Sequence, residues 1–212
     1  VTALYTTAGI TGLGNEAVTL SDSSVASASL NSLNALTAGD INAASVTTLT
    51  GNLSDVTASY TTAGITGLGN EAVTLSDASV NAADLNTLDG KTTVTVNAGS
   101  VGTLTGTAGA IDTAINASTI DTGAAVLVNI NSGSATVAQA NSIDAQTSGV
   151  VTATISDHSI SALSGLNNST GNAYTISVTD SSVDAAALNT LDGKTTVNVN
   201  ASSVGTLTGT AA

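Results

Sequence analysis

The side chains with the greatest potential for chemistry are carboxylates at repeated positions. The repeated pairs are Glu16 with Asp22 and Glu71 with Asp77, and two LDGK stretches hold Asp89 and Asp192. Ca²⁺ takes about six to eight oxygen ligands from clustered groups of this kind. The calcium-binding repeat G-G-x-G-x-D-x-U-x is absent from the chain. We therefore expect no metal site and no cofactor, with calcium-dependent contact as an alternative.

A glycine-rich loop is the second candidate. The stretch AGITGLGNEA holds Gly9, Gly12 and Gly14, and the same letters occur again at positions 63–72. A phosphate-binding loop needs a different glycine spacing and a helix directly after it. Because the whole stretch is repeated in tandem, we interpret it as a tight corner of the backbone.

The remaining polar candidates lack the partners that catalysis needs. His158 is the only histidine, and no second metal ligand or ordered carboxylate pair stands beside it in the sequence. Lys91 and Lys194 are the only basic residues, and each follows an Asp-Gly turn. Asn residues recur at one position of the repeat: Asn31, Asn86, Asn141 and Asn189. We predict no catalytic, cofactor-binding or metal-binding residues, and no enzyme.

Composition indicates which elements hold these side chains. Of 212 residues, 37 are Thr, 20 Val and 11 Ile, whereas Phe, Trp, Met, Pro and Cys are absent. Such β-branched residues favour strands, and the lack of large aromatic residues indicates a thin core. The net charge of −13 repels phosphate groups and anionic membranes. Nucleic acid is therefore excluded as a partner, and membrane insertion is excluded because no run approaches the roughly 18 to 20 apolar residues that span a bilayer.

Two periods organise the chain. Residues 1–55 and 56–110 align without a gap and are identical at 36 of 55 positions. A diverged copy follows at 111–173 and a partial copy at 174–212. Inside each unit, apolar pairs at spacing three form a shorter period, and the first members of successive pairs are Ile10, Leu30, Val46 and Ile65. We interpret each step of this shorter period as one coil with its apolar anchors buried.

Short alternating stretches such as AVTL and TVTVNA are typical of strands. Stacking them coil on coil predicts a single all-β domain over 1–212, a parallel β-solenoid of about 11–12 coils of 16–20 residues, and a right-handed β-helix. Helical repeats are disfavoured because Ser, Thr, Asn and Gly interrupt nearly every turn. A leucine-rich repeat is suggested by LNSLNAL, but its L-x-x-L-x-L frame is missing.

The wording of the repeats resembles that of a known group. The phrases VTLSDSSV, LNTLDGKTTV and SVGTLTGTA resemble the tandem repeats of giant secreted or cell-surface proteins, adhesin-like, of cyanobacteria and proteobacteria. The resemblance implies a structural segment of a large extracellular bacterial surface protein, as a stalk, surface layer or filament component. Its partners would be neighbouring repeats, or other copies end to end.

Two further expectations concern the parent protein and a second function. The absence of Met predicts that the sequence is part of a longer chain. The alternative function is a surface- or ligand-binding β-helix that contacts glycan, calcium or ice. Ice binding would need an unbroken grid of Thr, whereas the TLT stretches at 48–50, 103–105 and 206–208 are separated by other sequences.

Overall fold

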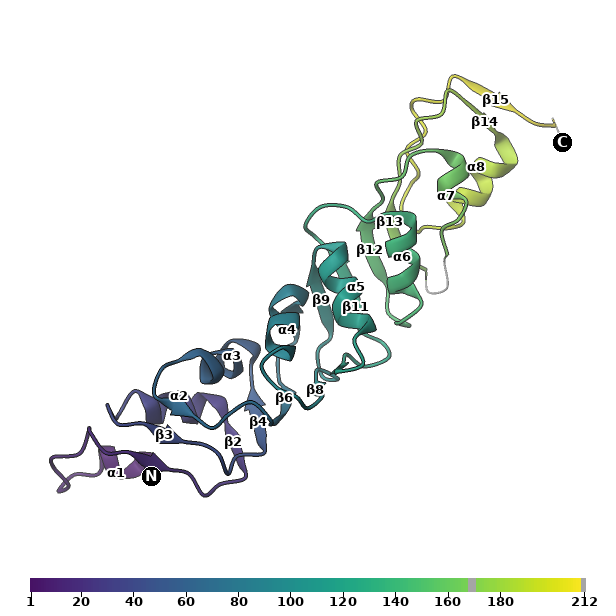
Figure 1. Cartoon of the computed structure of the whole chain (residues 1–212). Helices are drawn as coiled ribbons and strands as arrows, with labels where there is room; N and C mark the ends of the chain where they lie inside the picture. Colours follow the sequence, from purple (N-terminus) through teal and green to yellow (C-terminus); the bar gives the residue numbers. More distant parts are fainter. Residues whose placement is uncertain (168–170, 211–212) are drawn as a thin grey trace. The chain divides into compact units, whose positions relative to one another are not determined.

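The computed structural model describes residues 1–167 and 171–210, and it is a mixed α/β structure (Figure 1). Helices lie between the strands of parallel sheets, so the prediction of an all-β β-solenoid or β-helix is wrong. The helices are α1 Thr2–Thr6, α2 Ser27–Asn34, α3 Leu53–Thr61, α4 Ala82–Asp89, α5 Ala108–Asn116, α6 Val137–Asp144, α7 Ile160–Leu163 and α8 Ala185–Asp192.

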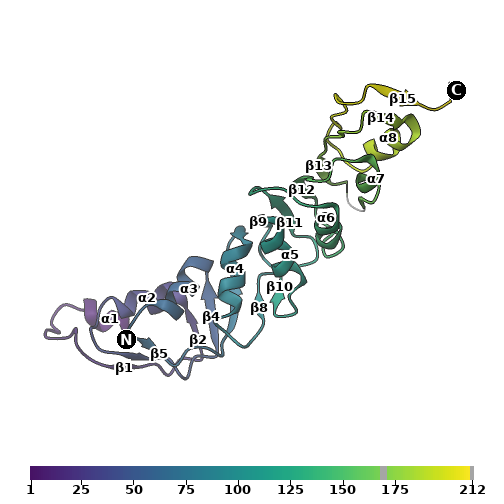
Figure 2. The ribbon, with the colours of Figure 1, turned by 45° about the horizontal axis from the view of Figure 1, so that its top comes forward.

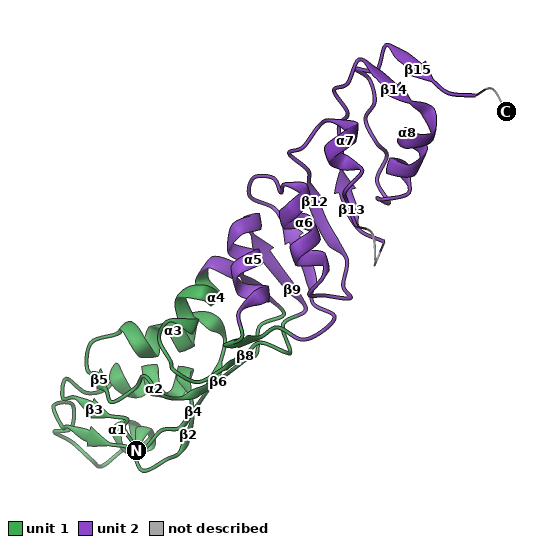
Figure 3. Cartoon of the chain, turned by 45° about the vertical axis from the view of Figure 1, so that its right-hand side comes forward, with its two compact units in different colours: residues 1–78, 84–101, 118–122 green, residues 79–83, 102–117, 123–212 purple. Residues whose placement is uncertain are grey.

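The chain forms two compact units, coloured separately in Figure 3. Unit 1 comprises residues 1–78, 84–101 and 118–122. Its first sheet has the order β1-β3-β5, and its second has the order β10-β8-β6-β4-β2. These strands are β1 Val18–Thr19, β2 Ser24–Ala26, β3 Ile41–Asn42, β4 Thr48–Gly51, β5 Ile65–Thr66, β6 Ala72–Leu75, β8 Val96–Asn97 and β10 Ile120–Asp121.

Unit 2 comprises residues 79–83, 102–117 and 123–212, described as far as residue 210. One sheet has the order β13-β12-β11-β9-β7, and the other pairs β14 with β15. The strands are β7 Ser79–Asn81, β9 Thr103–Gly106, β11 Leu127–Ile130, β12 Val151–Thr154, β13 Ala173–Thr175, β14 Ser182–Asp184 and β15 Thr206–Thr208. The predicted repeat boundaries at 55, 110 and 173 do not coincide with the limits of these units.

The step between paired strands is longer than the predicted length of a coil. Leu49 in β4 lies opposite Val73 in β6, and Leu104 in β9 lies opposite Val128 in β11. Each of these steps contains a whole helix, α3 in the first case and α5 in the second. Parallel pairing normally requires such a connection. The predicted number and length of coils are therefore wrong.

The helices explain why the predicted step is too short. Leu30 and Leu33 lie on one face of α2 and are 1% and 3% exposed. Spacing three fits a helix, and α2 packs beside α3 in both views of unit 1 (Figures 1 and 2). Since the described helices are all short, packing of an apolar face stabilises them more than intrinsic propensity does.

Several of these helices have at their N-terminus a polar residue of a type that is unfavourable in a helix interior. The side chain of Asn52 accepts a hydrogen bond from Asp55 N at the start of α3, and that of Thr107 accepts one from Ala110 N at the start of α5. Thr136 forms a capping box with Gln139 at the start of α6. Ser, Thr, Asn and Asp are the preferred N-cap residues, so a composition that argues against helices also provides their start signals.

The core contains aligned apolar side chains from neighbouring strands together with apolar side chains of the helices. In unit 1, Leu49, Val73 and Val96 are paired in neighbouring strands and are at most 1% exposed. Two residues that were expected to be buried anchors are outside this core, because Ile10 and Leu13 are 44% and 41% exposed. The prediction that Ile10 is buried is wrong. No described helix is long and apolar enough to cross a membrane.

Candidate functional site

The most densely bonded carboxylate belongs to Glu71, directly before β6. Its side-chain oxygens accept hydrogen bonds from the backbone N–H groups of Gly69 and Asn70, at 2.8 and 3.0 Å, and from the hydroxyl of Tyr60 at 2.9 Å. Glu71 is only 1% exposed. Its lone pairs are therefore engaged inside the fold, where three donors offset the cost of burying the charge.

The Tyr60 hydroxyl is held in its neutral form by this arrangement. Burial raises the pKa of Tyr60 well above its usual range, and the hydrogen bond to the Glu71 carboxylate adds to the effect. A neutral phenol that donates to a buried carboxylate is a structural pair.

The first repeat contains the same arrangement in a more open form. Glu16 accepts hydrogen bonds from Gly14 N at 2.7 Å and Asn15 N at 3.2 Å. These backbone donors, the Gly14 bond foremost, lower the pKa of the Glu16 carboxyl group. The glycine loop thus presents its amides to a carboxylate of the same chain. Gly12 and Gly14 have φ values of 88° and 135°, which explains why the loop needs glycine.

Aspartates that end the strand segments act as caps for helices. Asp77 accepts a hydrogen bond from Leu53 N at the start of α3 at 2.8 Å. Asp157 accepts one from Val137 N in the same way, and Asp180 one from Ile160 N, both at 2.7 Å. Each carboxylate satisfies an amide that the helix itself leaves unpaired. Sequence reasoning paired Asp77 with Glu71 as a calcium candidate, whereas the structure gives the two side chains separate backbone partners.

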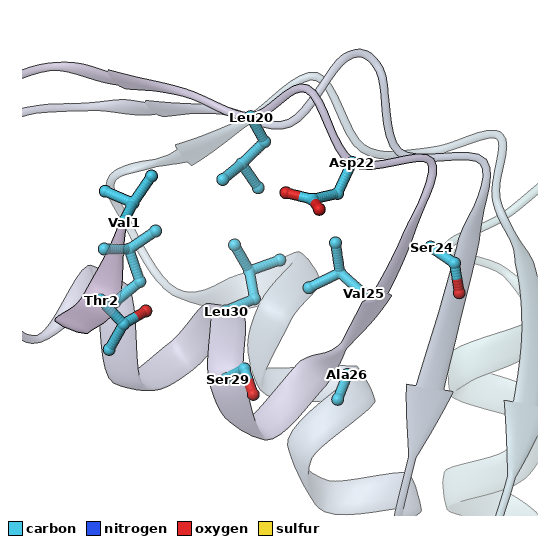
Figure 4. A pocket seen from close by; sticks show the side chains of 10 residues that line it. Val1, Thr2, Leu20, Asp22, Ser24, Val25, Ala26, Ser29 and Leu30 are labelled. Atoms are coloured by element: carbon cyan, nitrogen blue, oxygen red, sulfur yellow. The ribbon is translucent and has the colours of Figure 1, made fainter.

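Asp22 is the exception among these aspartates. It ends the stretch AVTLSD, which is identical to the stretch that Asp77 ends, but Asp22 is exposed. Its carboxylate points toward Leu20, Val25 and Leu30 around a cavity of about 260 Å³ in unit 1 (Figure 4). Val1, Thr2 and Leu33 also line this cavity.

A repeated threonine was missed by sequence reasoning. Each copy donates its hydroxyl to a carbonyl 21 residues earlier and accepts an N–H from two residues later. The threonines are Thr37, Thr92, Thr147 and Thr195. The first three recur at the period of the long repeat, which is the signal that could have identified them.

Two of the recurring asparagines and the first LDGK aspartate form hydrogen bonds to other segments of the chain. Asn31 donates to Asp55 O at 2.9 Å, and Asn141 donates to Gly165 O at 2.7 Å, so each connects its helix to a later segment. Asp89 accepts from Thr119 Oγ1 at 2.8 Å. Asn189 and Asp192 instead line a cavity of about 340 Å³ beside β15.

The basic and imidazole candidates lie on the surface of their units. His158 is exposed, and its Nδ1 lies 3.1 Å from Ser177 O. Lys91 is exposed and Lys194 is half-buried. Across residues 1–167 and 171–210, no group of three or more His, Asp or Glu side chains could hold a metal ion.

A second buried polar cluster lies in unit 2. Asn172 donates to Asp144 Oδ1 at 2.6 Å and to Tyr174 Oη at 3.0 Å, and its own Oδ1 accepts from Val151 N. Burial is the main cause that raises the pKa of Tyr174 above its usual range, and the nearby Asp144 charge acts in the same direction. Asn172 and Tyr174 are fully buried, so this cluster fixes the packing around β13.

Comparison with protein-family models, with curated proteins and with solved structures finds no match. The class of protein is therefore defined by the structure alone: an α/β repeat protein whose repeated polar side chains bind its own backbone.

Proposed function

We propose that the chain is a structural repeat segment of a large extracellular bacterial surface protein, a stalk, surface-layer or filament component without catalysis. The observation that carries the proposal is the use of the repeated polar side chains. Glu71, Asp77 and Thr92 all accept from or donate to the backbone of their own unit. A structural spacer requires the residues that stabilise each repeat to be present in every copy. A catalytic site has no reason to recur in tandem.

The proposed location is supported by composition. The chain has no Cys, which avoids thiol chemistry outside the cell. Fifteen acidic residues against two basic ones keep neighbouring chains from associating nonspecifically. The resemblance of its repeat phrases to those of secreted bacterial surface proteins points in the same direction.

The proposal is tested by immunogold electron microscopy of the source cells with antibodies against this fragment. We expect labelling of intact cells, and loss of the label after mild surface proteolysis. Labelling that needs permeabilised cells would contradict the extracellular location. A surface structure of unchanged length after deletion of the repeats would contradict the structural role.

A further inference from the structure

Two exposed apolar side chains lie next to each other on a sheet of unit 2. Leu127 in β11 is 47% exposed, and Val150, directly before β12, is 36% exposed. Val128 lies opposite Val151, and Val128 N donates to Val150 O at 3.0 Å. Since neighbouring strands are about 4.8 Å apart, Leu127 and Val150 are direct neighbours across β11 and β12, which are labelled in Figure 1.

The exposure of this pair does not arise at the edge of a sheet. Strand β11 pairs with β9 on one side and with β12 on the other, and β12 also pairs with β13. Val128 and Val151 point into the core and are 1% and 0% exposed. Because side chains alternate along a strand, Leu127 and Val150 stand on the outer face, where every strand around them is already paired.

Both apolar residues are particular to the diverged copy of the repeat. Small or polar residues hold the two positions in the earlier copies, 55 and 110 residues before Leu127 and Val150. They are Ala72 and Ala17 for the first position, and Thr95 and Asp40 for the second. A surface that only separates repeats has no physical reason to gain two adjoining apolar side chains. Adjoining apolar side chains on an exposed face are typical of a contact site.

Neutral polar side chains surround the pair. Thr103 in β9 lies opposite Leu127. In the next row, Asn129 lies opposite Thr105 on one side and Thr152 on the other. Asn129 and Thr152 are both exposed, so an amide and a hydroxyl group are open to a ligand beside the apolar pair.

No strand of this sheet contains a charged residue. The five strands read SVN, TLTG, LVNI, VTAT and AYT, in a chain that has fifteen acidic residues. The net charge of −13 repels an anionic partner, and a cationic partner would meet no carboxylate on these strands. The chemistry of the face therefore fits a neutral partner.

The form of the face favours an extended partner. Small molecules bind in concave sites that enclose most of their surface, whereas these residues stand on the outer face of a sheet. A neutral sugar ring has an apolar C–H face and hydroxyl groups around its rim. The C–H face matches Leu127 and Val150, and the hydroxyl groups match the amide of Asn129 and the hydroxyl of Thr152.

We infer that the outer face of β9, β11 and β12 binds a neutral, extended polysaccharide. Leu127 and Val150 cover the C–H face of a sugar ring, while Asn129 and Thr152 form hydrogen bonds with its hydroxyl groups. The inference adds attachment to the proposed structural function. It rests on that function only for the place where the polymer is met, because the contact itself requires only the sheet.

Binding is tested by sedimenting the purified chain with microcrystalline cellulose or chitin, which are neutral β-linked polymers, and with an alginate gel, which is anionic. We expect binding to at least one neutral polymer and none to alginate. Val150→Asp should lower the affinity about tenfold or more, as for a central contact residue. The matched control is Val94→Asp, because Val94 is also 36% exposed but lies in unit 1. This variant should bind like the wild type.

A second variant tests the apolar pair without adding charge. Leu127→Ala combined with Val150→Thr restores the residues of the second copy, Ala72 and Thr95. Thermal unfolding should be unchanged, because both side chains are exposed, while binding falls as it does for Val150→Asp. A double variant that binds like the wild type would overturn the inference.

Other outcomes would also overturn it. They are equal losses for Val150→Asp and Val94→Asp, and alginate binding as strong as cellulose binding. Self-association that the double variant abolishes would assign the face to a second copy, and thermal hysteresis that it abolishes would assign the face to ice. A chain that is labelled on intact cells but binds neither neutral polymer would refute this inference alone. A chain that binds a neutral polymer but is found only inside cells would refute the proposed location alone.

Discussion

The hydroxyl of Tyr60 in α3 donates a hydrogen bond of 2.9 Å to the carboxylate of Glu71, which precedes β6. The bond connects the helix of one step to the glycine loop that leads into the next strand. Tyr60→Phe removes the donor and leaves the carboxylate, which is 1% exposed, with only backbone partners. We expect a loss of about 1–3 kcal/mol in the free energy of unfolding.

Urea unfolding measures this loss as a lower midpoint at an unchanged slope. The matched control is Tyr5→Phe, because Tyr5 is the counterpart of Tyr60 in the first repeat and lies beside the more open Glu16. A larger loss for Tyr5→Phe than for Tyr60→Phe would show that burial of the carboxylate does not decide the effect.

Alkaline pH should destabilise the fold through Tyr60 and Tyr174. Both have a pKa raised above the unfolded value of about 10.0, chiefly by burial. The folded state then keeps protons that the unfolded state releases. The stability that these tyrosines contribute is therefore fully present below pH 10 and falls as pH rises toward the folded pKa values.

Absorbance at 295 nm follows the ionisation directly, since the chain has only three tyrosines. We expect two of them to ionise together with the loss of far-ultraviolet circular dichroism. Ionisation of all three in a chain that stays folded would contradict the burial of Tyr60 and Tyr174.

Sequence reasoning identified the parallel, repeated nature of the strands but not the helices. The 36 identities between the first two units made the repeat plain. Leu30 and Leu33 are predicted as buried anchors of one coil, although spacing three on LNSLNAL also fits the face of a short helix. Packing against the neighbouring helix and side-chain caps stabilise such short helices despite their low intrinsic propensity.

The roles of the polar residues could be predicted only in part. The repetition of Glu71 and Asp77 showed that they matter to the repeat, but their partners depend on the pairing of strands that are distant in sequence. Asn172 and Tyr174 lie in the diverged copy, where no repeated counterpart marks them. The pairing of distant segments is set by register, which a one-residue error in the period would change completely.

Removal of divalent cations should leave the fold intact. The carboxylates of Glu71 and Asp77 accept hydrogen bonds from the chain itself, and no described group of acidic side chains could hold a metal ion. We expect the melting temperature to be the same in excess EDTA and in millimolar CaCl₂. A large loss of stability in EDTA would favour the calcium-dependent alternative.

The caps formed by aspartate allow a comparison of two identical sequence stretches. Asp77→Ala removes the partner of Leu53 N and should cost about 1 kcal/mol, as other lost N-terminal caps do. Asp22→Ala in the same motif should change the stability of the isolated chain by less than about 0.5 kcal/mol, because Asp22 is exposed. Equal losses in chemical denaturation would mean that Asp77 acts through its charge rather than as a cap.

The final prediction compares two leucines in the identical sequence TLTG. Leu104 in β9 is 0% exposed between Val80 and Val128 on its two neighbouring strands, whereas Leu207 in β15 is 61% exposed and, among the described residues, is paired only with Val183. Leu104→Ala leaves a cavity in the core and should lower the free energy of unfolding by about 2–5 kcal/mol. Leu207→Ala removes a side chain that is mostly in water already, so dilute monomer should lose less than about 1 kcal/mol. Thermal unfolding of both variants at low concentration measures the difference, and comparable losses would contradict the pairing of β15 on one edge only.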